Sequence, residues 1–305
     1  MNKTLILSSG FFAGEDYYVS RFLDRGVLTA HSLRPQPHRL MRAARRLHFR
    51  AGLPMKSVWF EPWDDLVDEA DLVLVSASNL SVPATLYIRS RWPGKRIVAW
   101  YWNPSGPGTD PGILPPDVCE SWSFDRGDCK KFGLSYNTTY SFRDIADFRS
   151  EDDTDFLFVG TNKGRARFLS LLAEELREHG FSFRFCITGL SRDEISSYPL
   201  LEPIEPISYE EILRLTGSAR TVVELPQAGQ NGMSLRPIEA FMMGKKILSF
   251  SDEISSEPLY DPGRVLTLDH LDIERIEDFM RVDSPPASQE LLEHYDFDQW
   301  IRRFG

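Results

Sequence analysis

Short apolar runs alternate with helical patterns along nearly the whole chain. The first run is Leu5-Ile6-Leu7, and later ones such as Phe156 to Val159 are each followed by residues in a helical pattern. In the helical stretch from Arg165 to His179, apolar residues recur every four positions. This alternation is typical of βα units, which assemble into mostly parallel sheets. The pattern therefore predicts an α/β fold.

The first half contains four such units and predicts one domain over residues 1–145. The expected strands are Thr4 to Ser8, Leu72 to Ser76, Arg96 to Trp100 and Ser121 to Phe124, and the expected helices are Asp16 to Arg25, His38 to Ala51, Pro83 to Arg91 and Arg126 to Phe132. The pattern is lost from Tyr140 to Thr154, where five acids gather. That composition predicts a solvated linker, with a hinge at residues 146–154.

A second α/β series fills residues 155–290. The expected strands are Phe156 to Val159, Phe183 to Thr188, Thr221 to Leu225, Lys246 to Phe250 and Val265 to Leu268, and the expected helices are Arg165 to His179, Tyr209 to Leu215, Leu235 to Met243 and Ile273 to Met280. Residues 291–305 are expected to form a C-terminal helix that packs back on the first domain. A chain of 305 residues suits two domains. The predicted fold is two doubly wound Rossmann-like domains that face each other across a cleft.

One stretch of the second half carries an anion-site pattern. Gln230, Asn231 and Gly232 lie in a polar turn between the apolar run Thr221 to Leu225 and a helix that begins near Ser234. Arg236 and Glu239 lie in the first turns of that helix, and Gly244-Lys245-Lys246 follows it. Backbone N–H groups at a helix start favour an anion, and a carboxylate one turn further can accept hydrogen bonds from sugar hydroxyls.

These residues resemble a known family. Gln230 to Ala240 with Gly244-Lys245-Lys246, preceded by Phe158-Val159-Gly160 and Arg165, looks like the donor half of bacterial GT-B glycosyltransferases of cell-surface polysaccharide synthesis (capsule, exopolysaccharide or lipopolysaccharide). Trp122 to Asp128 is similar to a segment that precedes the hinge in such proteins. The resemblance is strong from Phe156 to Ser251 and weak before Trp100.

The resemblance implies a role for each matching residue. Glu239 matches the ribose-binding carboxylate, and Lys163 and Arg165 match basic groups that neutralise the donor diphosphate, so that no metal is required and Arg165 counts as catalytic. Further donor contacts are expected from Gly160, Tyr209, Gln230, Asn231, Gly232, Ser234 and Arg236. The nucleotide sugar would be a substrate, and no cofactor is expected.

Each of these residues also has a structural interpretation. Glu239 could be a helix carboxylate that complements the dipole, Lys163 and Arg165 could be solvated loop charges, and Arg236 could be an ion-pair partner. Gly160 and Gly232 could serve turns that need positive φ. Asn231 stands eight positions before Glu239, where many retaining relatives have a second glutamate, so the sequence leaves retention or inversion at the anomeric carbon open.

The resemblance also implies that the first domain holds the acceptor. Gly10 and Gly14 space the loop after the first strand, and Glu15 or Asp16 at the next helix start are the candidate general bases of an inverting enzyme. Asn103 begins a loop at the carboxyl end of another strand. The structural alternatives are N-capping by the acids, including Asp125 ahead of the helix at Arg126, and an irregular loop at Asn103.

A basic segment stands out in an acidic chain. The net charge of −10 argues against a general nucleic-acid surface, yet Arg34 to Arg50 contains six arginines, two histidines and no acid. The helix predicted there has Leu40, Met41, Ala44, Leu47 and Ala51 on one side, and Arg39, Arg42, Arg45, Arg46 and Arg50 over much of the rest. Two interpretations follow. The basic side chains form a solvated face while Leu and Met pack inward, or the helix contacts anionic lipid or the diphosphate of a polyprenyl-linked acceptor.

Composition narrows the location. No apolar run reaches the roughly 18 residues needed to span a bilayer, and the N-terminal run is too short for a signal peptide, so we expect a cytoplasmic protein, peripheral on the inner face of the plasma membrane if the basic helix binds it. Cys119, Cys129 and Cys186 form no CxxC pair and support neither a disulfide framework nor a metal site. The resemblance to GT-B glycosyltransferases implies a glycosyltransferase of the hexosyltransferase type, which moves a sugar from a nucleotide diphosphate to a surface glycan or lipid-linked acceptor. The alternatives are a non-catalytic nucleotide-sugar or glycan-binding module and a nucleotide-sugar epimerase.

Overall fold

The computed structural model describes residues 3–8, 14–226 and 233–304, and its contacts divide the chain into two compact units. The first runs to Thr138 and also takes in Arg303 and Phe304, and the second is Thr139–Arg302. The hinge predicted at residues 146–154 lies within the second unit by this division and stays a prediction. In that stretch Asp147 and residues 149–153 are exposed, whereas Phe142 and Ile145, just before it, are buried.

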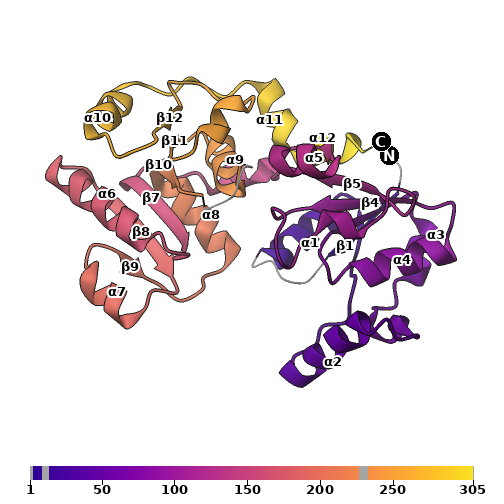
Figure 1. Ribbon diagram of the computed structural model, residues 1–305. Coiled ribbons are helices and arrows are strands. Elements are labelled where there is room, and N and C mark those ends of the chain that lie inside the picture. Colours follow the sequence, from indigo (N-terminus) through magenta and orange to yellow (C-terminus); the bar gives the residue numbers. More distant parts are fainter. Residues whose placement is uncertain (1–2, 9–13, 227–232, 305) are drawn as a thin grey trace. The chain divides into compact units, whose positions relative to one another are not determined.

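The first unit is a parallel sheet covered by helices (Figure 1). Its elements are β1 (Thr4–Ser8), α1 (Glu15–Asp24), β2 (Leu28–His31), α2 (Arg39–Arg50), a 3-10 turn η1 (Lys56–Trp59), α3 (Asp64–Glu69), β3 (Leu72–Ser76), α4 (Val82–Arg91), β4 (Arg96–Tyr101), η2 (Pro111–Ile113), β5 (Glu120–Ser123), α5 (Arg126–Phe132) and β6 (Ser135–Tyr136). The described strands lie in the order β2-β1-β3-β4-β5-β6, and neighbours run parallel.

The second unit repeats this architecture. Its elements are η3 (Arg143–Phe148), β7 (Thr154–Thr161), α6 (Ala166–Glu178), β8 (Phe183–Thr188), α7 (Arg192–Ser197), β9 (Glu202–Pro203), α8 (Tyr209–Ser218), β10 (Ala219–Glu224), α9 (Leu235–Met242), β11 (Lys246–Ser249), η4 (Asp252–Ser256), β12 (Val265–Thr267), α10 (Ile273–Arg281), α11 (Gln289–Tyr295) and α12 (Phe297–Arg302). The described strand order is β12-β11-β10-β7-β8-β9, again parallel.

Each unit has its own core between sheet and helices. In the first, Leu5 and Val73 from adjacent strands are fully buried and belong to the same cluster as Ile88 of α4. In the second, Phe156 of β7 and Leu172 of α6 are fully buried in one cluster. Because both faces of a parallel sheet are covered, its strands appear in the sequence as nearly continuous apolar runs. This explains why most strands were predicted correctly.

The C-terminal segment differs from the single helix expected at 291–305. Asp296 adopts an extended backbone conformation between α11 and α12. Its carboxylate accepts a hydrogen bond from the Arg143 amide at 3.1 Å, and the Ser141 carbonyl accepts one from the Phe297 amide at 2.9 Å. These long-range contacts, one to the Asp296 carboxylate and one between backbone groups, hold the chain in the break between the two helices. Such contacts cannot be seen from local periodicity.

Gly217 in α8 has a steric requirement. A Cβ atom built there would lie 1.9 Å from the carbonyl oxygen of Phe148, and the Gly217 carbonyl accepts a hydrogen bond from the Ser150 amide at 3.0 Å. Only glycine permits the two backbones to approach this closely. The segment that follows η3 is thereby fastened to α8 within the second unit.

Candidate active site

A pocket of about 170 Å³ lies at the carboxyl ends of the central strands of the second unit. Its lining comes from β7, β10, the loop after β7 and the start of α9, and includes Phe158, Val159, Lys163, Arg165, Glu224, Ser234 and Arg236. Ligands of open parallel sheets bind outside the carboxyl ends of the strands. Lys163, Arg165, Ser234 and Arg236, four of the residues predicted to bind the donor, therefore line one cavity.

Arg165 is fixed in the pocket wall by backbone carbonyls. Its Nη1 donates to the Leu225 carbonyl at 2.7 Å, its Nε to the Asn162 carbonyl at 3.3 Å, and its Nη2 to the Thr161 carbonyl. The guanidinium carbon also lies 4.9 Å from the centre of the Phe158 ring. Burial lowers the pKa of Arg165 and Glu224 offsets part of this effect, but an arginine starts so high that it stays charged. Arg165 thus places a preorganised positive charge at the cavity.

Gly160 makes room for this arrangement. A Cβ atom at Gly160 would lie 3.2 Å from Nη2 of Arg165 and 3.3 Å from the Phe158 ring. Gly160 is not among the glycines with positive φ, so the turn interpretation of this residue is wrong. Lys163 is instead the residue with the unusual backbone, at φ 43°, and its side chain is exposed. The loop from Gly160 to Arg165 therefore combines a close approach with a left-handed turn.

The start of α9 carries the motif recognised in the sequence. Ser234 is the N-cap, and its hydroxyl accepts a hydrogen bond from the Arg236 amide at 3.3 Å. Glu239 is 0% exposed, and its two carboxylate oxygens accept hydrogen bonds from the Tyr209 hydroxyl and from Nη1 of Arg236. Burial raises the pKa of Glu239, and Arg236 and Tyr209 offset part of the rise. The ion-pair interpretation of Arg236 is confirmed, and Arg236 also reaches the pocket.

Glu224 lines the same pocket and was missed by the sequence-based prediction. It ends β10, is 8% exposed, and has its pKa raised to about 7 by burial, against which Ser234, Arg236 and Arg165 act. The available signal was an acid at the end of the apolar run Thr221 to Leu225, at the ligand-bearing edge of the sheet. A carboxyl that is half protonated near neutrality is compatible with a neighbouring anion, whereas a fully ionised one would repel it.

Four of the predicted site residues, Gly10, Gln230, Asn231 and Gly232, lie outside the described residues.

The structure does place the other predicted residues of the first unit. Gly14 is the buried N-cap of α1, Asp16 is exposed in its first turn, and Asn103 is exposed beyond β4. The N-cap interpretation of Asp125 is confirmed, because its side chain accepts a hydrogen bond from the Asp128 amide at 2.9 Å.

Glu15 lies beside Ser8 and His31, a grouping that the sequence did not reveal. Its carboxylate accepts a hydrogen bond from the Ser8 hydroxyl at 2.5 Å and lies 3.8 Å from Nε2 of His31. Ser8 and His31 are register partners at the carboxyl ends of β1 and β2. His31 was overlooked because β2 itself was not predicted. A carboxylate beside a histidine is an arrangement used for proton transfer.

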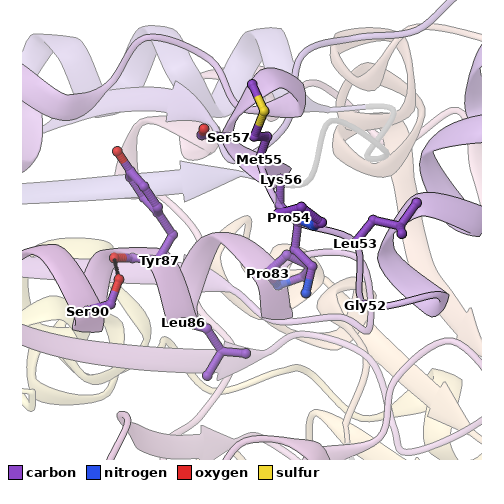
Figure 2. A pocket seen from close by; sticks show the side chains of 10 residues that line it. All are labelled: Gly52, Leu53, Pro54, Met55, Lys56, Ser57, Pro83, Leu86, Tyr87 and Ser90. Carbon is purple, nitrogen blue, oxygen red and sulfur yellow. Dashed lines mark hydrogen bonds between the residues drawn. The ribbon is translucent and has the colours of Figure 1, made fainter.

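The first unit has a pocket of its own, of about 410 Å³, formed by the turn after α2 and by α4 (Figure 2). Leu53, Met55 and Lys56 lie on one side and Leu86 and Tyr87 on the other. The pocket lies close in sequence to the basic helix and has a more apolar lining than the pocket of the second unit.

The basic helix requires two corrections. Arg45 is 4% exposed and donates a hydrogen bond to the Arg34 carbonyl at 2.9 Å, so it cannot face a membrane as predicted. Leu40 and Leu47 are 84% and 67% exposed, so the interpretation with packed Leu and Met is also wrong. The helix presents its apolar side chains outward.

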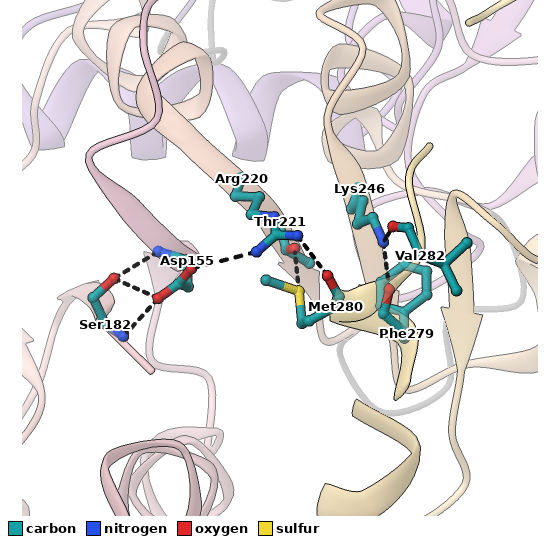
Figure 3. A network of polar contacts seen from close by, with 8 residues as sticks. All are labelled: Asp155, Ser182, Arg220, Thr221, Lys246, Phe279, Met280 and Val282. Carbon is teal, nitrogen blue, oxygen red and sulfur yellow. Dashed lines mark hydrogen bonds and ion pairs between the residues drawn. The ribbon is translucent and has the colours of Figure 1, made fainter. Parts of the chain in front are cut away.

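Another group of cations lies at the amino-terminal edge of the second sheet and is structural (Figure 3). Lys246 Nζ donates to the carbonyls of Phe279 and Val282, and Arg220 donates to the Met280 carbonyl. These contacts fasten the end of α10 to the sheet. Lys245, at 4% exposure, lies 2.6 Å from Asp152. The two lysines of the Gly244-Lys245-Lys246 motif are therefore engaged away from the pocket.

Comparison with known proteins rests on structure, since no family model and no curated protein matches the sequence. A glycosyltransferase involved in avilamycin A biosynthesis, AviGT4, superposes with a TM-score of 0.60 at 14% identity, covering 100% of this chain and 96% of its own. Anabaena HepE, in complex with UDP and glucose, gives 0.59 at 10% identity, with 100% and 98% covered. The chain has a GT-B-like fold.

Another protein with this GT-B-like fold has a different activity. The UDP-GlcNAc 2-epimerase from Neisseria meningitidis, bound to UDP-GlcNAc, gives a TM-score of 0.53 at 12% identity, covering 100% of this chain and 98% of its own. Similarity at this level establishes the fold and leaves the reaction to the site. Among the described residues, no group of three or more His, Cys, Asp or Glu is placed to hold a metal ion. In the same part of the chain, no helix is long and apolar enough to cross a bilayer.

Proposed function

We propose that the protein is a glycosyltransferase of the hexosyltransferase type that takes a sugar from a nucleotide diphosphate. The observation that carries the proposal is the cavity at the carboxyl ends of β7 and β10, where Lys163, Arg165 and Arg236 meet. Three cations at the strand ends suit a diphosphate, and the N-cap of α9 adds a helix start that favours anions. HepE and the epimerase, two proteins of the same fold, were solved with UDP or a UDP-sugar bound.

In this proposal the chemistry is carried by stabilisation of the leaving diphosphate. Arg165 is already held in place by three carbonyls, so little reorganisation accompanies charge development on the leaving group. Lys163 adds a second, exposed charge. The acceptor is a surface glycan or lipid-linked glycan of polysaccharide biosynthesis, Glu15 or Asp16 supplies the base if the reaction inverts, and no metal takes part.

Glu239, the proposed ribose ligand, can bind a ribose hydroxyl only after one of its present partners moves. Both of its oxygens are occupied and the side chain is fully buried. A ribose hydroxyl can reach it only if Arg236 or Tyr209 gives way. Arg236 is the better candidate because it lines the pocket, where the donor diphosphate offers it a second anionic partner.

The substitution Lys163→Asn tests the donor site with little risk to folding. Asparagine tolerates the left-handed backbone at this position, and the side chain is exposed. Loss of one charge-assisted contact, worth about 1.5–3 kcal/mol, is expected to weaken UDP binding by about 10-fold or more in calorimetry. Binding of a CMP-sugar, which has a single phosphate, should be weak in wild type and change less. Arg192→Asn, an exposed cation on α7, is the matched control. UDP affinity unchanged by Lys163→Asn would remove Lys163 from the donor site.

Product analysis separates transfer from the other activities of this fold. Incubation with UDP- and GDP-sugars should give slow donor hydrolysis, with release of the nucleotide diphosphate. An isomerised donor would identify an epimerase, and tight binding without turnover would identify a non-catalytic binding module. Either result would overturn the proposed reaction.

A further inference from the structure

Helix α2 has the reverse of the orientation expected for an amphipathic helix of a globular domain. Figure 1 shows it standing off from the sheet of the first unit. Its only buried residue is Arg45, whereas Leu40 and Leu47, two turns apart, are 84% and 67% exposed. Globular proteins turn the apolar stripe of a surface helix toward the core. Here the apolar stripe faces outward.

Polar contacts on the inner side hold this orientation. Nη1 of Arg45 donates to the Arg34 carbonyl at 2.9 Å, and the Arg34 amide donates to the Trp59 carbonyl at 2.8 Å. The indole N–H of Trp59 in turn donates to Nδ1 of His48 at 3.2 Å. Rotation of the helix about its axis to bury the leucines would break these contacts. The outward stripe is therefore a built feature of the first unit.

The outward surface combines apolar and basic side chains in two adjoining stripes. At 100° per residue, Leu40, Ala44, Leu47 and Ala51 form one stripe, and Arg39, Arg46 and Arg50 form the next one around the helix. All seven of these residues are exposed. We call this the α2 surface.

The apolar character continues beyond the helix. Leu53, Met55 and Val58 are 49%, 74% and 48% exposed, and Leu53, Met55 and Lys56 line a pocket together with Leu86 of α4 (Figure 2). Leu86 is itself 41% exposed. From Arg34 to Phe60 the sequence holds six arginines, one lysine and no acid, within a chain of net charge −10. The surface is thus apolar and strongly basic at once.

We infer that the α2 surface docks on an anionic lipid bilayer, with α2 lying in the plane of the interface. An apolar stripe flanked by arginines is the form of an interfacial helix, whose apolar side chains enter the boundary between headgroups and acyl chains by about 5–10 Å. Charge complementarity selects this occupant, because an anionic leaflet attracts every cation of the surface and the surface has no acid that would be repelled. A second copy of the chain would have to bring the same positive charge against it.

This docking does not depend on the reaction proposed for the second unit. Every residue of the α2 surface belongs to the first unit, and the donor pocket belongs to the second. Loss of either property in an experiment therefore leaves the other to be measured. Docking would bring the first unit to the surface where lipid-linked substrates are held.

Flotation with vesicles tests the inference. We expect the full-length protein to float with vesicles of phosphatidylcholine and phosphatidylglycerol at low salt, to remain unbound with phosphatidylcholine alone, and to detach at high salt. The variant L40S/L47S should bind at least about 10-fold more weakly, since it removes two side chains that the bilayer would bury. The variant R39E/R46E/R50E should bind more than about 100-fold more weakly, because each basic residue contributes about a fivefold change in affinity and all three charges are reversed.

Matched controls come from exposed positions of the second unit. The substitutions L171S/V282S remove one leucine and one valine side chain of 47% and 51% exposure, and R167E/R177E/R192E reverses the charge of three exposed arginines. Both controls should float like wild type. All replaced side chains are exposed, so circular dichroism should be unchanged.

Three results would overturn the inference. Wild type that stays unbound on anionic vesicles excludes bilayer docking. Equal loss of binding in the control variants would show that vesicle binding depends on the overall charge or nonspecific adsorption of the protein and not on the α2 surface. Dimerisation in sedimentation velocity that L40S/L47S abolishes, without flotation, would assign the α2 surface to a second copy of the chain.

Discussion

Replacing Glu224 by glutamine is expected to remove a pH-dependent loss of stability from the second unit. Glu224 is 8% exposed, and burial raises its pKa from 4.5 to about 7. Because the pKa in the folded protein lies above that in the unfolded chain, the folded protein binds more protons than the unfolded chain between these two values. The contribution of Glu224 to stability is therefore fully present below pH 4.5 and is lost as the pH rises through 7.

The magnitude follows from the size of the shift. A rise from 4.5 to about 7 corresponds to roughly 3 kcal/mol in the free energy of unfolding, at about 1.4 kcal/mol per pKa unit. At about pH 5 the Glu224 carboxyl of the unfolded chain is already partly ionised, so part of the roughly 3 kcal/mol has already been lost at that pH. Between about pH 5 and about pH 8.5, wild type should lose roughly 2–3 kcal/mol relative to Glu224→Gln.

Urea unfolding of both full-length proteins at the two pH values, followed by circular dichroism, measures this difference. Titrating groups distant from Glu224 act equally in both proteins, so the difference between the two curves reports Glu224 together with the charged neighbours coupled to it, Arg165, Arg236 and Glu239. Glu178→Gln, at an exposed position of α6, is the matched control and should follow wild type. If wild type and Glu224→Gln change in parallel with pH, Glu224 does not titrate near neutrality in the folded protein and the reasoning fails.

Two further predictions concern the same unit. Glu239→Gln leaves Arg236 without its carboxylate and should lower the free energy of unfolding by about 3 kcal/mol, whereas the double variant R236Q/E239Q should recover part of the loss; a double variant as unstable as the sum of the single ones would contradict a coupled pair. Gly217→Ala should lower stability by about 3 kcal/mol or more in thermal unfolding, because its Cβ would lie 1.9 Å from the Phe148 carbonyl oxygen. Gly94→Ala, where a Cβ meets nothing within 4 Å, is its control, and equal melting of both variants would refute the steric argument.

The regular elements could largely be predicted from the sequence because parallel strands buried on both faces leave long apolar runs. The strand Phe183–Thr188 and the helix Arg126–Phe132 have the predicted bounds. The missed elements are short or half-buried. All four residues of β2 (Leu28–His31) are partly exposed, and β9 (Glu202–Pro203) is a two-residue edge strand. Their position comes from pairing with a neighbouring strand, which a local pattern does not contain.

The pocket of the second unit was predicted in its residue types and only partly in its geometry. Lys163, Arg165, Ser234 and Arg236 were expected together and do line one cavity. The sequence could not show that Arg165 donates three hydrogen bonds to backbone carbonyls. Every residue has a backbone carbonyl, so the residue types of the acceptors carry no signal. Glu224 was missed for a different reason. Its importance depends on burial and on its neighbours, and neither is a property of position 224 alone.

Helix α2 shows where periodicity stops being informative. The spacing of Leu40 and Leu47 establishes an apolar stripe, but a stripe has the same period whether it faces a core or the solvent. The direction is decided by Arg45, which looks like one more surface cation and instead caps the Arg34 carbonyl from a buried position. Arg45→Met would keep a side chain of similar length and remove the hydrogen bond to the Arg34 carbonyl at the base of α2. The helix would then have lost the contact that fixes its outward face, so flotation on anionic vesicles should weaken although every residue of the α2 surface is intact. Unchanged flotation of this variant would mean that His48 and Trp59 suffice to hold the helix.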